Sequence, residues 1–138
     1  MIKANSRYDD YAYRVAYFNL SDTVESIEEG QFGTFDENGE VVLADSTSKK
    51  VFLVIGSKRA GRDQISGKAT KRIAFLHGPF LVSISNYDEE GTYNGGLTPL
   101  KISDEGTVTP VTAEGTDIVV AYAIGQPSGG FLTIVSNN

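Results

Sequence analysis

The chain has 138 residues, which is enough for one domain with a sizeable core, and its lack of cysteine excludes disulfide frameworks and thiolate chemistry. Its net charge of −6 argues against nucleic acid as a general partner. The first residues lack the apolar run of a signal peptide, and no later run is long enough to span a bilayer. The composition therefore predicts a soluble protein that is made inside a cell and binds neither nucleic acid nor membrane.

Charge is distributed unevenly along the chain. Residues 49–72 contain eight of the twelve basic residues and one acid, Asp63, so this segment carries +7 and the remainder −13. Such a split can orient a partner or a neighbouring subunit through complementary fields. A solvated basic loop would have the same composition, and this alternative remains open.

The first thirty residues differ in composition from the rest. Four of the seven tyrosines fall here, among arginines and aspartates, at Tyr8, Tyr11, Tyr13 and Tyr17. Tyrosine mixed with arginine is typical of contact surfaces. We expect residues 1–30 to form an N-terminal arm and linker, with residues 1–20 binding a partner, and residues 31–138 to form the β domain. The alternative is that residues 15–20 form a peripheral strand of that domain.

The β domain opens with a predicted hairpin over Gln31–Ala44, because an Asn38-Gly39 turn separates two β-prone runs. The apolar run Val51–Ile55 predicts a buried strand. The next segment, Gly56–Lys71, is rich in glycine and basic residues and shows no apolar pattern. A stretch of this length and composition predicts an exposed functional loop or a disordered one.

Another strand is expected from Arg72 to Leu76. The His-Gly-Pro sequence that follows Leu76 interrupts it. The alternation that begins at Phe80 predicts a strand with one buried face. Residues 86–96 form an acidic, glycine-rich loop, and residues 131–135 form the last strand.

The clearest pattern lies in residues 95–124. Leu100 and Ile102 alternate with polar residues, and the turn that follows ends in Gly106, which can adopt the positive φ that a short hairpin needs. Pro110 cannot donate to a ladder, so the returning strand is predicted at an edge or a bulge. Ile118–Ile124 is apolar throughout, which predicts a central strand covered on both faces.

No segment shows a sustained helical period, and fifteen glycines separate short β-prone runs. The predicted fold is therefore all-β: a small sandwich or barrel of roughly eight to ten short antiparallel strands with an extended N-terminal arm.

No group of residues predicts catalysis. Gly61–Thr70 has the wrong spacing for a phosphate loop, and no helix follows it. His77 is the only histidine, so neither a two-histidine metal site nor a histidine relay is possible within one chain. Asp88, Glu89 and Glu90 lack the alternating ligands of a calcium loop and are interpreted as a solvated acidic tip. Carboxylates paired in space for glycoside hydrolysis stay open, although tryptophan is absent. We expect no enzyme activity and no cofactor.

Two regions resemble the capsid decoration (cement) proteins of tailed bacteriophages. They are Gln31–Ile55 and Tyr93–Ile134, the second with the pattern G-x-L-x-x-L-x-I-S-D-x-G-x-V-x-P, then I-V-V-A-Y-A-I, then F-L-T-I. The resemblance implies synthesis in the host cytoplasm and attachment to the outer surface of the virion shell. It also implies binding to the major capsid protein, bridging of neighbouring capsomers, and self-association as a trimer or dimer.

The alternative is a carbohydrate- or receptor-binding β module of a phage tail or fibre. For the N-terminal arm, the expected partner-binding residues are Arg7, Tyr8, Tyr11 and Arg14. In the basic segment, an acidic partner surface or an acidic face of a neighbouring subunit is expected to contact Lys58, Arg59, Arg62, Lys68, Lys71 and Arg72.

Overall fold

A computed structural model describes residues 2–4, 15–62, 69–76, 79–112 and 115–137. The described chain is all-β and antiparallel, without a helix, as the sequence predicts. The described residues contain eleven strands: β1 (Ile2–Ala4), β2 (Val15–Asn19), β3 (Phe32–Phe35), β4 (Val41–Leu43), β5 (Phe52–Arg62), β6 (Ala69–Leu76), β7 (Leu81–Ile84), β8 (Leu97–Ile102), β9 (Val108–Pro110), β10 (Ala121–Ile124) and β11 (Leu132–Ser136).

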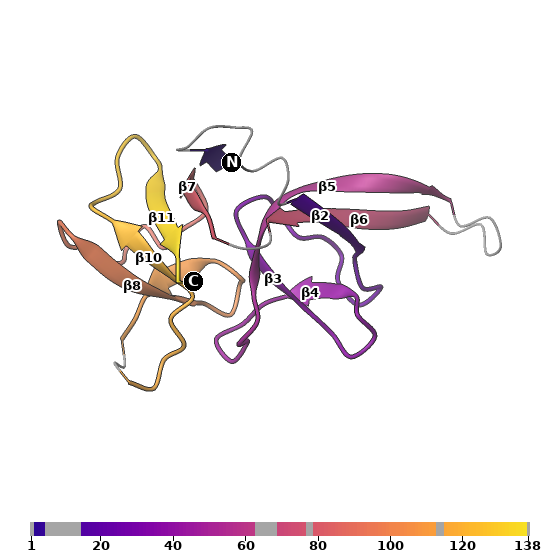
Figure 1. The fold of residues 1–138 in the computed structure, drawn as a ribbon, viewed down its shortest axis with the longest axis horizontal. Coiled ribbons are helices and arrows are strands. Elements are labelled where there is room, and N and C mark those ends of the chain that lie inside the picture. Colours follow the sequence, from indigo (N-terminus) through magenta and orange to yellow (C-terminus); the bar gives the residue numbers. More distant parts are fainter. Residues whose placement is uncertain (1, 5–14, 63–68, 77–78, 113–114, 138) are drawn as a thin grey trace.

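The strands form two sheets. Sheet A has six strands in the order β1-β7-β11-β10-β8-β9, and sheet B has five in the order β2-β6-β5-β3-β4. In Figure 1, sheet A occupies one half of an elongated molecule and sheet B the other, and the β5–β6 hairpin projects from the end of sheet B. Pro110 lies in the edge strand β9, as predicted from its missing amide proton.

One apolar core joins the sheets. Sheet B contributes Phe32, Leu53 and Leu76, and sheet A contributes side chains that include Leu100 and Ile134, all less than 5% exposed. Side chains alternate between the faces of a strand, so only every second residue of each strand reaches this core.

The other face of sheet B carries a second apolar cluster. Val54 and Ile73 are fully buried there, and Leu20 and Ile27 from the segment after β2 pack over them. The centre of β5 is therefore covered on both faces, which explains the uninterrupted apolar run in its sequence.

The prediction for β10 needs correction. The strand is central, between β11 and β8, but it spans Ala121–Ile124 rather than Ile118–Ile124. Ala121 and Ala123 are fully buried, whereas Ile124 is 41% exposed. The apolar run suggested two covered faces, but sheet A packs against sheet B through one face only.

Two parts of the predicted N-terminal arm are edge strands. β1 pairs with β7, with Lys3 opposite Ser83, and β2 pairs with β6, with Tyr17 opposite Ala74. This is the peripheral-strand alternative for residues 15–20. Each segment supplies the outermost strand of a sheet.

The predicted loop over Gly56–Lys71 is wrong for residues 56–62 and 69–71, which lie in strands, and residues 63–68 lie outside the described chain. β5 continues to Arg62, and β6 begins at Ala69. Main-chain hydrogen bonds hold the two strands together whatever their side chains are, so a ladder can form without an apolar pattern. The ribbon consequently leaves no apolar period in the sequence.

Candidate partner-binding surface

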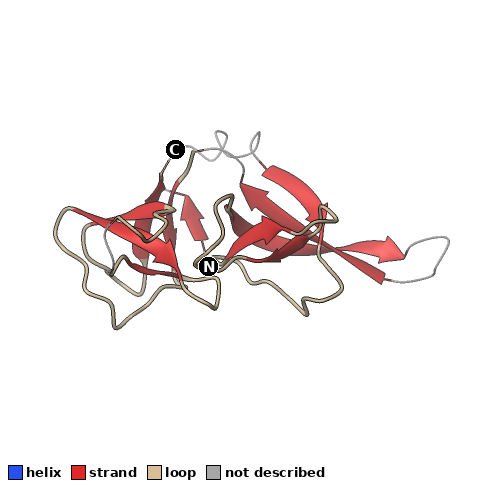
Figure 2. Ribbon diagram, turned by 90° about the horizontal axis from the view of Figure 1, so that it is seen from below, coloured by secondary structure: helices blue, strands red, loops and turns tan. Residues whose placement is uncertain are grey.

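The most unusual feature of the fold is a two-stranded ribbon that extends beyond sheet B. Its residues, 58–62 of β5 and 69–72 of β6, are called the basic ribbon below. β3 contacts β5 only at Phe52 and Leu53, and β2 accompanies β6 only as far as Arg72. Past that point the pairing among described residues involves β5 and β6 alone. Figure 2 shows the ribbon extending past the rest of the molecule.

An irregularity in β5 marks the root of the ribbon. The register with β6 shifts between Val54 and Gly56, and again between Ala60 and Arg62. Bulges of this kind bend a strand and increase its twist. The first shift lies just before β5 leaves the packed part of the sheet, at a position where a bulge can set the direction of the ribbon.

The register places like charges opposite each other. Lys58 is the cross-strand partner of Arg72, and Arg59 is the partner of Lys71. Directly opposed like charges destabilise a β ladder. Two consecutive cationic pairs favour an anionic partner, whose charge would offset the repulsion.

A cluster of four phenylalanines lies at the root of the ribbon. Each comes from a different strand of sheet B: Phe18, Phe35, Phe52 and Phe75. The ring centroids of Phe18 and Phe35 are 5.0 Å apart, and those of Phe52 and Phe75 are 3.9 Å apart. Phe52 and Phe75 are buried, but Phe18 is 44% and Phe35 41% exposed. The cluster thus begins inside the protein and ends at its surface.

The exposed end of this cluster adjoins the basic ribbon through the β2–β6 register. Phe18 is opposite Ile73, and the next pair, Asn19 with Arg72, points to the other face of the sheet, so the patch and Arg72 are neighbours along the strand but lie on different faces. Tyr17, on the same short strand, is 52% exposed. Aromatic and arginine residues next to each other are enriched in protein interfaces. We call Phe18 and Phe35 the aromatic patch, because Tyr17 precedes Phe18 and its side chain points to the opposite face of the strand.

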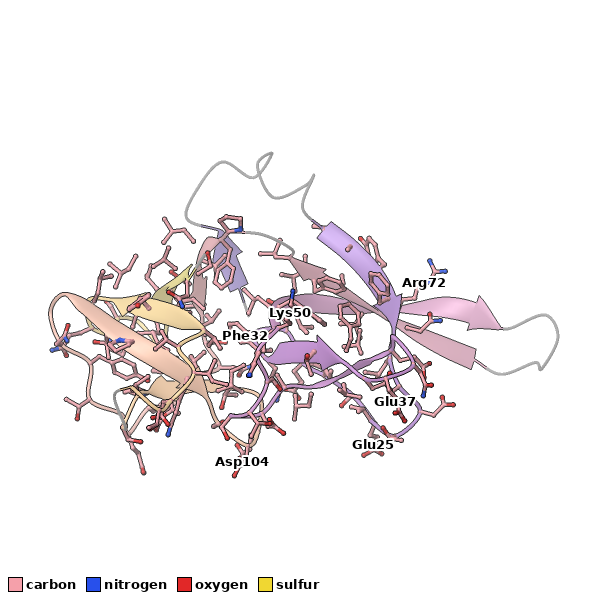
Figure 3. The ribbon with its side chains drawn as sticks, turned by 60° about the horizontal axis from the view of Figure 1, so that its bottom comes forward. Glu25, Phe32, Glu37, Lys50, Arg72 and Asp104 are labelled. Carbon is pink, nitrogen blue, oxygen red and sulfur yellow. The ribbon has the colours of Figure 1, made fainter. Side chains whose placement is uncertain are left out.

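An acidic edge lies on the loops of both sheets. Residues 21–48 contain eight carboxylates and no basic residue. Gln31 connects this segment to sheet A, because its side-chain oxygen accepts from the Glu28 amide at 2.8 Å and its side-chain amide donates to the Glu105 carbonyl at 2.9 Å. In Figure 3, Glu25, Glu37 and Asp104 lie along one side of the molecule, and Arg72 lies on the other side of sheet B. The acidic edge is defined by six exposed residues of these loops: Asp22, Glu25, Glu28, Glu37, Asp104 and Glu105.

A cleft of about 650 Å³ lies between the sheets. Most of its lining is apolar, with Phe32, Phe80 and Val120 among the contacts, and Lys49 and Lys50 are its charged lining residues. No carboxylate or histidine lines it within the described chain. The lining therefore offers no carboxylate pair for glycoside hydrolysis.

The acidic 88–90 turn is held by structural hydrogen bonds. The Asp88 carboxylate accepts from the Thr109 hydroxyl at 2.9 Å and from the Glu90 amide at 3.0 Å. The Tyr93 hydroxyl donates to the Asp88 carbonyl at 2.7 Å. Burial, and then the nearby charges of Asp88 and Tyr87, raise the pKa of Tyr93 to about 12. Among the described residues, no three acidic or histidine side chains are grouped to hold a metal ion.

The predicted site residues are only partly described. The register brings together Lys58 with Arg72 and Arg59 with Lys71, and Arg62 lies opposite Ala69 on the same ribbon. The remaining predicted residues lie outside the described chain: Arg7, Tyr8, Tyr11, Arg14 and Lys68. The sequence prediction missed Phe18 and Phe35, whose proximity follows from strand pairing between distant segments and leaves no local signal.

No family model matches the chain, and neither a curated protein nor a solved structure matches it. Among the described residues there is no helix of the length and apolarity needed to cross a membrane.

Proposed function

We propose that this protein is a structural, non-catalytic component of a phage virion that binds the outer surface of the capsid and stabilises contacts between capsomers. Its partner is the major capsid protein, and it self-associates as a dimer or trimer. The observation that supports a binding role best is the aromatic patch beside the basic ribbon. The assignment to a phage shell comes from the sequence resemblance of Gln31–Ile55 and Tyr93–Ile134 to decoration proteins.

The aromatic patch has the composition of a contact surface. Exposed phenylalanines that continue a buried cluster can bury their apolar area against a partner. The loss of side-chain entropy on binding is small, because neighbouring rings already hold them in place. Phe18 is held in this way by Phe35 and Phe75, at centroid distances of 5.0 and 5.6 Å. We expect Phe18 to act as the central anchor of shell binding.

A capsid lattice suits such a surface. Each shell repeats the same binding position many times, and a self-associated protein can engage several positions together, which raises the overall affinity without new contacts. Clamping of neighbouring capsomers requires binding energy alone, and the described residues of the cleft offer no carboxylate or histidine for other chemistry.

Co-sedimentation with empty shells tests this proposal. The shells are assembled from the major capsid protein that is encoded nearest to this protein's gene. Wild-type protein should pellet with them, and Phe18→Ser should reduce binding at least about tenfold, as for an interface anchor. Leu97→Ser is the matched control, since Leu97 is 59% exposed but lies on sheet A.

Two results would contradict this proposal. If wild-type protein stays in the supernatant and binds defined sugars on a glycan array, the protein is a carbohydrate-binding module. If Phe18→Ser and Leu97→Ser bind shells as well as wild type, the aromatic patch is not the contact. Thermal denaturation of both variants shows whether each is folded.

A further inference from the structure

We infer that the basic ribbon of one copy binds the acidic edge of a second copy, so that the protein associates head to tail. The inference deepens the self-association within the proposed function and identifies the surfaces that meet. It does not depend on shell binding.

The basic ribbon is poorly stabilised by its own chain. It has two strands, and an isolated two-stranded ribbon is at best marginally stable in water. Its register places Lys58 against Arg72 and Arg59 against Lys71. Like charges at opposed register positions repel each other, and the ladder lacks a third strand beyond Arg72 in the described chain. An anionic surface along the ribbon would remove that repulsion.

The acidic edge supplies the complementary charge. Its carboxylates come from the loop after β2, the β3–β4 turn and the β8–β9 turn, so they form a broad surface rather than a single point. Asp36 fixes the β3–β4 turn, because its carboxylate accepts from the amides of Asn38 and Glu40, both at 2.9 Å. Gln31 fixes the loop after β2 against Glu105. The carboxylates are thus presented on ordered turns.

The shape of the molecule favours contact between copies. The ribbon projects from the end of sheet B, whereas the acidic edge runs along the side of both sheets (Figures 1 and 3). A chain therefore cannot lay its ribbon along its own acidic edge. A second copy can, and such heterologous contacts close into a ring, as in the proposed trimer, when the last free ribbon meets the first acidic edge.

A nucleic acid fits these charges less well than a second copy does. The basic segment carries +7, but the rest of the chain carries −13 and would repel a polyanion that extends past the ribbon. A second copy presents both signs in the same arrangement, so each basic ribbon meets an acidic edge.

Charge reversal tests the inference in solution, without shells. One variant carries Lys58→Glu, Arg59→Glu, Lys71→Glu and Arg72→Glu, and the other carries Asp22→Lys, Glu28→Lys, Glu37→Lys and Asp104→Lys. Sedimentation velocity at low salt should show self-association of the wild type and a monomer for each variant alone. An equimolar mixture of the two variants should associate again, because each ribbon then faces an edge of opposite charge.

Salt dependence and a control variant show whether the association depends on these charges. Association of the wild type should weaken at least about tenfold between about 0.01 M and about 1 M salt, where the Debye length falls from about 30 Å to about 3 Å. Reversal of Glu89 and Glu90, which are exposed on the β7–β8 loop, should leave association unchanged.

Three results would overturn the inference. These are a monomeric wild type, variants that associate like the wild type, and a mixture that stays monomeric. If the wild type binds shells but stays monomeric, the proposed function stands and the inference fails. If it associates but does not bind shells, the inference stands and the proposed function fails. Retention on duplex DNA that the ribbon variant loses, with no self-association, would assign the ribbon to nucleic acid.

Discussion

The amide of Phe32 donates a 2.8 Å hydrogen bond to the carbonyl of Gly106, and this bond joins the first strand of the β3–β4 hairpin to the turn of the β8–β9 hairpin. Gly106 has φ 75°. A Cβ built on it would lie 2.9 Å from Cγ of Leu43 and 3.3 Å from the Phe32 carbonyl oxygen. The two sheets therefore meet at a residue whose side chain must be a hydrogen atom, for both conformational and steric reasons.

Replacing Gly106 with alanine should destabilise the protein by about 2–5 kcal/mol. The left-handed conformation costs an L-residue about 1–2 kcal/mol, and overpacking against Leu43 adds about 1–3 kcal/mol. Gly39→Ala is the matched control, since Gly39 has φ 77° but no atom within 4 Å of the added Cβ. In urea denaturation, the free energy of unfolding of Gly39→Ala should fall by the conformational cost alone. Equal losses for the two variants would show that the contact with Leu43 relaxes freely.

The hydroxyl of Tyr93 links stability to alkaline pH. Because the pKa of Tyr93 is raised to about 12 from an ordinary value near 10, the unfolded chain loses this proton at a lower pH than the folded one. The contribution is fully present below pH 10 and is lost as the pH rises toward 12. Urea midpoints across this window should fall more steeply for the wild type than for Tyr93→Phe.

The phenylalanine variant also has an effect at neutral pH. It removes the 2.7 Å hydrogen bond to the Asp88 carbonyl and should cost about 1 kcal/mol. Parallel pH profiles for the two proteins between pH 10 and 12 would contradict the assigned cause.

Asp45 offers a test at acidic pH. The pKa of its carboxyl is lowered, first by the hydrogen bond from the Thr47 hydroxyl at 2.6 Å and then by the one from the Thr47 amide at 2.9 Å. Thr47→Val removes the hydroxyl donor and should move the pKa of Asp45 up toward its ordinary value. Ser48→Ala removes a longer contact, 3.4 Å, and should move it less. Titration of the carboxyl carbon by NMR measures both, and an unchanged pKa in Thr47→Val would contradict the assignment.

Local turn chemistry was predictable from the sequence because it depends on neighbouring residues. Gly39 and Gly106 both adopt positive φ in hairpin turns, and Pro110 lies in an edge strand, each for a reason present in its own segment. The contact of Gly106 with Phe32 and Leu43 was not predictable, since it joins residues that are more than sixty positions apart in the chain.

The candidate surface was only half predictable for the same reason. The composition of residues 49–72 revealed the concentration of positive charge, but the opposition of Lys58 and Arg72 depends on a ladder with no apolar period. The aromatic patch depends on the pairing of β2 with β6, and the segment around Phe18 carries no information about its neighbour. Pairwise register, rather than composition, turns these residues into a surface.

Truncation at the N-terminus separates the described edge strands from the proposed shell contact. Deleting residues 1–14 removes β1, a three-residue edge strand, and should lower the melting temperature only slightly, because water can satisfy the edge of β7. Shell binding should fall sharply if Arg7, Tyr8, Tyr11 and Arg14 bind the capsid. Circular dichroism and co-sedimentation measure the two effects independently.

Deleting residues 1–20 should have a different result. It also removes β2 and Leu20, and so uncovers Ile73 and Phe75, which are fully and almost fully buried in the second apolar cluster of sheet B. Loss of this cover should cost several kcal/mol, as for large core truncations, and lead to unfolding or aggregation. If the shorter deletion already abolishes the β signal, residues 1–14 are an integral part of the domain. If the longer one folds normally, β2 contributes little to sheet B.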